Sequence, residues 1–189
     1  MKPWFRCMEL IAPHVKAILR GWTMARRNRY LAGRRAKSSG DQFERIIEIN
    51  ARIKDFNLTK IWMGCERFGK GDRERLEKRK NPFDYIIQKR NDVPVFFDAK
   101  TRAGKTITYS DFYSSKSTKH QVETMSGMAD FGALTGFMVW FRELDRIYFI
   151  PIEKVENMKS RTSLGPDDGV DLGTLDDLKL DFIWDAFEC

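Results

Sequence analysis

One stretch near the middle of the chain limits its fold more than any other. Residues 83–89 and 93–101 are rich in Val, Ile, Phe and Tyr, and the polar residues Arg90, Asn91 and Asp92 connect them. Two β-prone runs joined by a short polar turn predict adjacent antiparallel strands. The sequence therefore predicts a β-hairpin, and any fold for this chain must include a sheet.

The sequence on either side of this hairpin adds two longer helices. Asp41 and Glu44 have the spacing of a capping box, which predicts a helix from residue 41 to about residue 54. Residues 115–131 show helical periodicity, with apolar residues gathered on one face. We therefore expect two helices to flank the sheet.

Shorter patterns supply the remaining elements. Strand-like runs occupy residues 58–63, 136–141 and 146–150, and the last two form a second hairpin. A short helix starts at residue 151, and the basic stretch over residues 64–80 reads as an insertion or a surface helix. The order of elements predicts an α/β or α+β domain with a mixed central β-sheet flanked by helices.

Length and composition exclude several classes of protein. The chain has 189 residues, enough for one well-cored domain, and its 42% hydrophobic content excludes a wholly disordered chain. It has no run of eighteen apolar residues and no signal-peptide pattern, so we expect neither membrane spanning nor secretion. Cys7, Cys65 and Cys189 have the spacing of neither a disulfide framework nor a zinc site, which favours the reducing cytoplasm.

The positive charge of the chain lies at its N-terminal end. Residues 1–40 hold ten Lys or Arg and one acid, whereas the remaining 149 residues hold 24 bases and 26 acids. Such an arm is typical of proteins that bind nucleic acid, although an organellar targeting segment or a solvated helix would give the same charge. Within it, residues 5–24 show the periodicity of an amphipathic helix.

These patterns divide the chain into three parts. We expect a basic N-terminal arm over residues 1–39, a catalytic domain over residues 40–164 and an acidic C-terminal segment over residues 165–189. The last part has eight acids and one base, and we expect either a solvated tail or a segment packed near the arm.

The strand of residues 93–101 carries the residues best suited to chemistry. Side chains alternate along a strand, so Asp98 and Lys100 share one face while Phe97 and Ala99 point into the core. Folding the hairpin brings Asp84 close to Asp98. Two carboxylates around Mg²⁺, with a lysine beside the attacking water, suit hydrolysis of a phosphodiester. The alternative is a surface Asp–Lys pair that contributes at most about 1 kcal/mol.

These residues resemble the P-D…(D/E)-x-K signature of the restriction-endonuclease-like nucleases, and more closely that of the RecU-type Holliday junction resolvases of bacteria and their phages. The resemblance covers about residues 40–164. It rests on these segments: Glu44 of the first helix, Asp84-Tyr85, Asp98-Ala99-Lys100, His120-Gln121 and Tyr148-Phe149-Ile150.

The resemblance implies a restriction-endonuclease-like α/β fold, to which this chain adds a basic helical arm. It also implies a homodimeric, Mg²⁺-dependent endonuclease, with Mn²⁺ as a substitute, that nicks a four-way DNA junction symmetrically. Asp84 and Asp98 would hold the metal together with the backbone carbonyl of Ala99, and Lys100 would orient or activate the water. Glu44 would complete the acidic cluster as a further metal ligand, and Gln121 would support the site.

Basic residues outside this site are expected to contact DNA phosphates, which position a protein without reading sequence. They are Arg26, Arg27, Arg29, Arg34, Arg35, Lys37, Lys70, Arg73, Arg75, Lys78, Arg79 and Lys80.

Two alternatives remain at this stage. A restriction, flap or repair endonuclease of the same superfamily would satisfy the same motif. A non-catalytic nucleic-acid-binding protein would need only the arm, and Asp98 and Lys100 would then be dispensable. For each of these readings we expect a cytoplasmic protein, in the host cell if a phage encodes it.

Overall fold

The computed structural model describes residues 37–61, 65–68, 75–78, 81–160 and 162–187. The chain separates into two compact units, Met1–Ser39 and Gly40–Cys189, and the second unit is described below. The helix expected over residues 5–24 lies outside the described residues.

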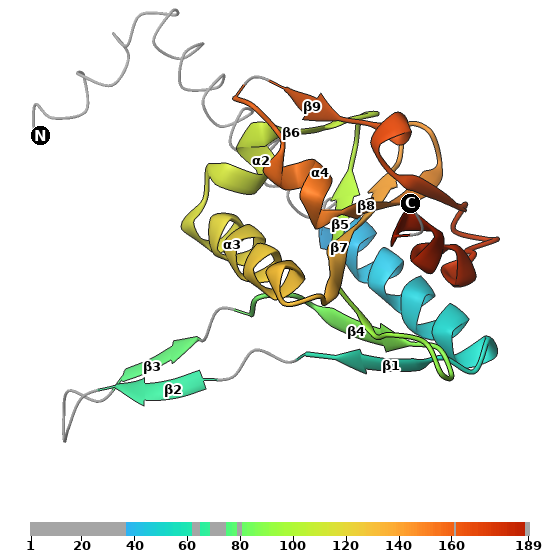
Figure 1. Ribbon diagram of the computed structural model, residues 1–189, viewed down its shortest axis with the longest axis horizontal. Helices are drawn as coiled ribbons and strands as arrows, with labels where there is room; N and C mark the ends of the chain where they lie inside the picture. The colour runs from blue at the N-terminus through green and yellow to red at the C-terminus, as the bar shows by residue number, and fades with distance from the viewer. Residues whose placement is uncertain (1–36, 62–64, 69–74, 79–80, 161, 188–189) are drawn as a thin grey trace, which may run out of the picture. The chain divides into compact units, whose positions relative to one another are not determined.

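A mixed six-stranded sheet forms the centre of this unit (Figure 1). Four of the five strand pairings are antiparallel, and the central pairing of β5 with β7 is parallel. This arrangement confirms the predicted mixed sheet and both predicted hairpins. In spatial order the strands are β1 (Asn57–Lys60), β4 (Tyr85–Gln88), β5 (Val95–Arg102), β7 (Leu134–Phe141), β8 (Arg146–Pro151) and β10 (Val170–Gly173).

Two small sheets accompany the central one. Strand β2 (Cys65–Phe68) pairs with β3 (Arg75–Lys78), and β6 (Ile107–Thr108) pairs with β9 (Ser163–Leu164). The first of these pairs falls in the stretch over residues 64–80. That stretch lies between β1 and β4 as an insertion, but the surface helix considered for it is wrong.

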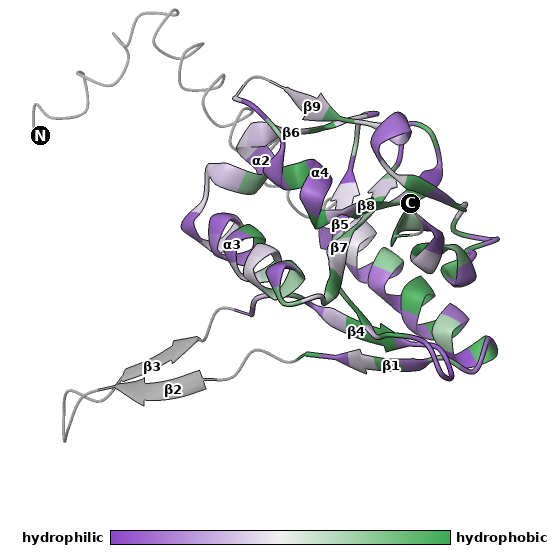
Figure 2. Cartoon of the chain, in the orientation of Figure 1, coloured by the Kyte–Doolittle hydropathy of each residue, from purple (hydrophilic) through white to green (hydrophobic). Residues whose placement is uncertain are grey.

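Helices cover both faces of the central sheet (Figure 1). One face carries α2 (Tyr109–Tyr113), α3 (Lys116–Asp130) and α4 (Ile152–Glu156). The other face carries the helix of residues 37–53 and the 3₁₀ segment η4 (Leu180–Phe187). Hydrophilic and hydrophobic residues alternate around α3, as expected of a helix with one face on a sheet (Figure 2). Among the described helices, none is both long enough and apolar enough to cross a membrane.

Alternation along the strands divides the core into two layers. Side chains such as Phe97 and Met138 pack with Phe43 and Ile47 of the helix on one face. On the other face Phe137 and its neighbours pack with α2, α3 and α4. A sheet with a core layer on each face needs strands whose side chains are apolar on both faces. Strand β7 meets this requirement, because seven of its eight residues are buried.

Within the described residues, the first helix begins at residue 37, before the expected start at residue 41. Residues 37–40 are already helical, so Asp41 lies inside the helix and the predicted capping box is wrong. The pair Asp41 and Glu44 also has the i, i+3 spacing of any two residues on one helical face, and sequence spacing alone does not separate these cases. The helix ends at residue 53, close to the predicted end.

The acidic C-terminal segment is part of the core. Strand β10 forms the last strand of the sheet, and Leu172, Leu178, Leu180 and Ile183 are fully buried against the helix of residues 37–53 and its neighbours. The expected solvated tail is therefore wrong for residues 170–183. The segment packs because its apolar residues recur between the acids and face inward while the acids face solvent.

Replacing Leu172 by Ala should lower the free energy of unfolding by about 2–5 kcal/mol, because it leaves a cavity in this core. The exposed Asp176→Ala change should alter it by less than about 0.5 kcal/mol. Urea unfolding of both variants measures the difference, and equal values would show that the C-terminal segment does not stabilise the fold.

Candidate active site

The pairing of β4 with β5 brings two carboxylates together. Tyr85 lies opposite Phe97, and the backbone N–H of Asp84 donates to the Phe97 carbonyl at 3.1 Å, so the register continues to Asp84 opposite Asp98. The Asp84 carboxylate accepts a hydrogen bond from the Ala99 backbone N–H at 3.4 Å. The hairpin therefore places both acids at one position of the sheet, as its sequence predicts.

Asp98 is buried and fully partnered. Lys100 lies two residues along the same strand, and its Nζ is 2.6 Å from Oδ2 of Asp98. From α3, the side-chain amide of Gln121 donates to Oδ1 of Asp98 at 2.6 Å, and Lys100 donates to the Gln121 carbonyl oxygen at 3.4 Å. The Lys100 ammonium also lies 5.1 Å from the centre of the Phe137 ring. These contacts hold the lysine, the amide and the carboxylate in one fixed arrangement.

Asp84 experiences both burial and a like charge. Burial, and after it the neighbouring Asp98, raise the pKa of its carboxyl to about 7, although the Ala99 N–H and Lys100 act in the opposite direction. Two adjacent carboxylates in a partly dry site cannot both stay ionised without a compensating cation. At neutral pH the two carboxylates therefore favour the binding of an additional positive charge.

A hard divalent cation would supply this positive charge. Magnesium prefers oxygen ligands and is usually held by one or two carboxylates with water and substrate phosphates supplying the rest. Within the described ranges no group of three or more His, Cys, Asp or Glu residues is placed to hold a metal. Asp84 and Asp98 are therefore the two carboxylates that could hold such a cation, and the part of the chain that the structure describes places no third acid with them.

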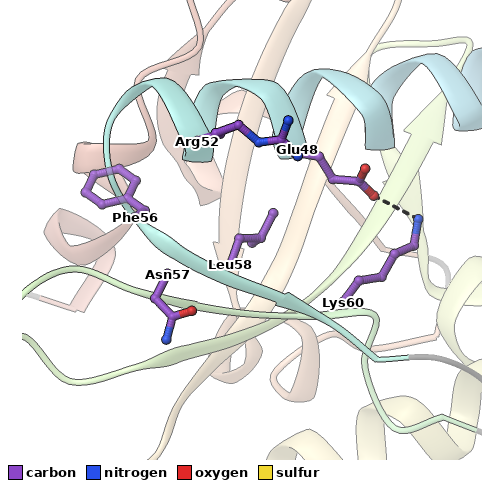
Figure 3. A pocket seen from close by; sticks show the side chains of 6 residues that line it. All are labelled: Glu48, Arg52, Phe56, Asn57, Leu58 and Lys60. Carbon is purple, nitrogen blue, oxygen red and sulfur yellow. Dashed lines mark hydrogen bonds and ion pairs between the residues drawn. The ribbon is translucent and has the colours of Figure 1, made fainter.

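The structure does not bring Glu44 to these acids. Its carboxylate lies 2.7 Å from Nζ of Lys60, and the Tyr85 hydroxyl donates to it at 3.5 Å. Lys60 also binds Glu48 at 3.0 Å, and Figure 3 shows these two side chains pointing toward each other at a pocket of about 360 Å³. Partial burial lowers the pKa of Lys60, but its bonds to Glu44 and Glu48 outweigh burial and raise it above the usual value.

This second network was not foreseen from the sequence. Lys60 and Tyr85 are far from Glu44 along the chain, and only strand pairing joins them: Lys60 lies opposite Tyr85 in the β1–β4 register. Burial of the Tyr85 hydroxyl raises its pKa, so it stays protonated and donates. The available signal was the alternation of side chains along a strand: Tyr85 directly follows Asp84, so the two side chains lie on opposite faces, and Tyr85 is buried toward the helix.

The predicted DNA contacts are only partly described. Lys37 is exposed on the first helix. Arg75 and Lys78 are the first and last residues of β3. The remaining ones lie outside the described residues: Arg26, Arg27, Arg29, Arg34, Arg35, Lys70, Arg73, Arg79 and Lys80.

Comparison with protein families gives a match over residues 73–177, more than half of the chain, to RecU, described as Recombination protein U. The chain belongs to the RecU family. RecU proteins resolve Holliday junctions, so the chain is a junction-cleaving nuclease by family. The RecU match includes Asp84, Asp98, Lys100 and Gln121, and it continues past residue 164 through β10.

Other comparisons are sparser. No curated protein sequence matches the chain. Among solved structures, the chain is similar to Hjc of the archaeon Archaeoglobus fulgidus, described as a Holliday junction resolvase, with a TM-score of 0.42 and 16% identity. That likeness covers 70% of this RecU chain and 95% of the Hjc chain.

The raised pKa of Asp84 predicts a pH-dependent stability for the metal-free protein. Between about pH 4 and pH 7 the folded state keeps a proton that the unfolded state releases, so the free energy of unfolding falls as pH rises. The Asp84→Asn variant has no carboxyl group at this position, so its free energy of unfolding does not fall with pH for this reason. In urea unfolding with EDTA, the free energy of unfolding of the variant relative to that of the wild type should rise by roughly 2 kcal/mol between pH 5 and pH 8.

The exposed Asp176→Asn change is the control, and it should follow the wild-type profile. If Asp84→Asn also follows that profile, the two carboxylates do not repel each other as the geometry requires.

Proposed function

We propose that this chain is a Mg²⁺-dependent endonuclease that resolves four-way DNA junctions by paired, symmetric nicks, and that Mn²⁺ can replace Mg²⁺. The observation that carries the proposal is the half-buried Asp84 beside the buried Asp98, with Lys100 fixed next to them, in a chain of the RecU family. An isolated surface ion pair would not need a buried acid, an amide clamp and a second carboxylate.

In this proposal Asp84 and Asp98 hold the cation, with the backbone carbonyl of Ala99 as a further ligand. When bound, the cation polarises the phosphoryl oxygen and favours ionisation of the attacking water. Asp98 is already fixed by Lys100 and Gln121, so its oxygens need little reorganisation to serve as ligands.

Lys100 has the task of orienting or activating the water. Its ammonium is anchored between Asp98 and Gln121, which limits its position at the end of a stiff strand. A lysine held there donates hydrogen bonds to a water or a phosphate oxygen and stabilises charge that develops on that oxygen. Gln121 supports the site by holding both partners at once.

Glu44 has a different place in this scheme. A role as metal ligand requires its carboxylate to leave Lys60, and no third acid joins Asp84 and Asp98 among the residues that the structure describes. Glu44 therefore serves best as part of the support beneath β4, with its expected metal role left to test.

DNA binding outside the site falls to the basic arm and to the basic residues between β1 and β4. Contacts from such residues to phosphates give affinity without sequence reading, which suits recognition of a branched shape. One chain offers one metal site, whereas symmetric resolution needs two, and a two-fold homodimer supplies the second.

Asp98→Asn should reduce cleavage of a four-way junction by at least about a thousandfold, since it removes a charge that holds the cation. DNA binding should be unchanged or tighter, because the loss of negative charge reduces repulsion of phosphate. Nicking assays with Mg²⁺ and gel shifts on the same preparation measure both, with Asp176→Asn as the control. Near wild-type cleavage by Asp98→Asn would mean that this site is not the catalytic one.

A dimer of two 22.2 kDa chains should sediment at roughly 44 kDa. A cruciform plasmid, which loses its junction after resolution, should be linearised within the lifetime of one complex. Four-way junction, flap and linear duplex should be compared side by side with Mg²⁺. A monomer on DNA, or equal turnover on all three substrates, would favour another endonuclease of the same superfamily.

A further inference from the structure

The face of β5 that carries Asp98 and Lys100 continues to a third charged residue, Arg102. Residues two apart on a strand share a face and lie about 6.6 Å apart. Contacts bear this out, because Lys100 reaches Gln121 on α3 and Arg102 forms an ion pair with Asp111 on α2, and both helices cover the same face. A row of acid, lysine and arginine therefore runs along the strand.

The backbone of Arg102 is fixed. It pairs with Phe141 at the end of the β5–β7 register, and its carbonyl accepts a hydrogen bond from the Arg142 backbone N–H at 2.8 Å. Its side chain is 32% exposed, so part of it is accessible from solvent. A cation on a rigid strand beside a reacting centre positions a ligand more accurately than a cation on a loop.

The partner of Arg102 is already satisfied by other donors. Oδ2 of Asp111 accepts from the Thr108 backbone N–H at 2.8 Å and from the Thr108 hydroxyl at 2.9 Å, which caps α2. Arg102 contacts only the other oxygen, Oδ1. Releasing Arg102 thus leaves the cap of α2 in place, and the exposed Asp111 oxygen can be solvated by water.

We propose that Arg102 binds a backbone phosphate of the DNA strand next to the phosphate that is cleaved, exchanging Asp111 for that phosphate when DNA enters. This inference rests on the proposed nuclease function. The planar guanidinium presents a fork of N–H donors that matches the oxygens of a phosphate. The carboxylates of Asp84 and Asp98 repel the DNA backbone, and a cation in the same row compensates for this on the approach to the site.

The test compares full-length wild type with Arg102→Gln, Arg102→Lys and a matched control. Arg146 is the control because it also forms a strand-borne ion pair, 2.6 Å from Asp171, but on β8 and β10, beyond β7 from the site. Binding of a labelled four-way junction is followed by anisotropy in EDTA over 50–200 mM salt. Arg102→Gln should weaken binding about tenfold and reduce the slope of log K against log salt by about 0.9, the loss of one phosphate contact.

Arg102→Lys keeps the charge and should keep the slope, while Arg146→Gln should leave both affinity and slope unchanged. With Mg²⁺, Arg102→Gln should raise the junction concentration for half-maximal cleavage more than it lowers the maximal rate. An unchanged slope in Arg102→Gln, or an equal loss in Arg146→Gln, would overturn the inference.

Asp111→Asn separates DNA binding from a structural role of the ion pair. It frees Arg102, so junction binding should be as tight as in wild type or tighter, even if Arg102→Gln folds poorly. Weaker binding by Asp111→Asn, with the same slope as Arg102→Gln, would show that the ion pair between Arg102 and Asp111 supports binding. That result would overturn the inference. If wild type binds the junction but cuts no DNA, the proposed function fails, while the slopes still decide whether Arg102 contacts a phosphate.

Discussion

The rest of this structure depends on the position of β5 between two partners of opposite direction. It pairs antiparallel with β4 and, over its full eight residues, parallel with β7. The first pairing sets Asp84 against Asp98, and the second anchors the strand to the most buried part of the sheet. Side chains on one face of β5 fill the core beneath the first helix, and those on the other face form the row of Asp98, Lys100 and Arg102. A shift of register by one residue would exchange the two sets and remove the site.

Charge balance explains how acids can be buried at this position. On one face, Asp98 receives Lys100 and Gln121, while Asp84 keeps a raised pKa and a demand for a cation. On the opposite face, Glu44 and Glu48 both bind the single ammonium of Lys60. The two networks adjoin at the start of β4, where Asp84 and Tyr85 follow one another but face opposite ways. Both networks hold two carboxylates and one lysine. In the second network both carboxylates bind the lysine, whereas in the first Lys100 binds Asp98 and the pKa of Asp84 is raised.

The C-terminal segment follows the same principle of inward apolar and outward charged groups. Its net negative charge predicts solvation when acids are counted together, yet Leu172, Leu178 and Leu180 recur between them and are buried. The acids that remain outside find cations across the surface, as Asp181 does with Lys54 at 3.0 Å and Asp171 with Arg146. Burial of a few leucines outweighs the composition because apolar area removed from water stabilises by about 25 cal/mol per Å².

The sequence by itself determined the local features: both hairpins, α3, the shared face of Asp98 and Lys100, and the approach of Asp84 to Asp98. Each of these depends on periodicity or on a turn of a few residues, and such signals lie within one segment. Only the tertiary structure decided the partners of Glu44, the strand pairing of residues 65–78, the start of the first helix and the burial of the acidic segment. Periodicity tells which side of an element is apolar, but not which distant element covers it. The choice among distant partners depends on packing and charge across the whole sheet, which no short stretch of sequence contains.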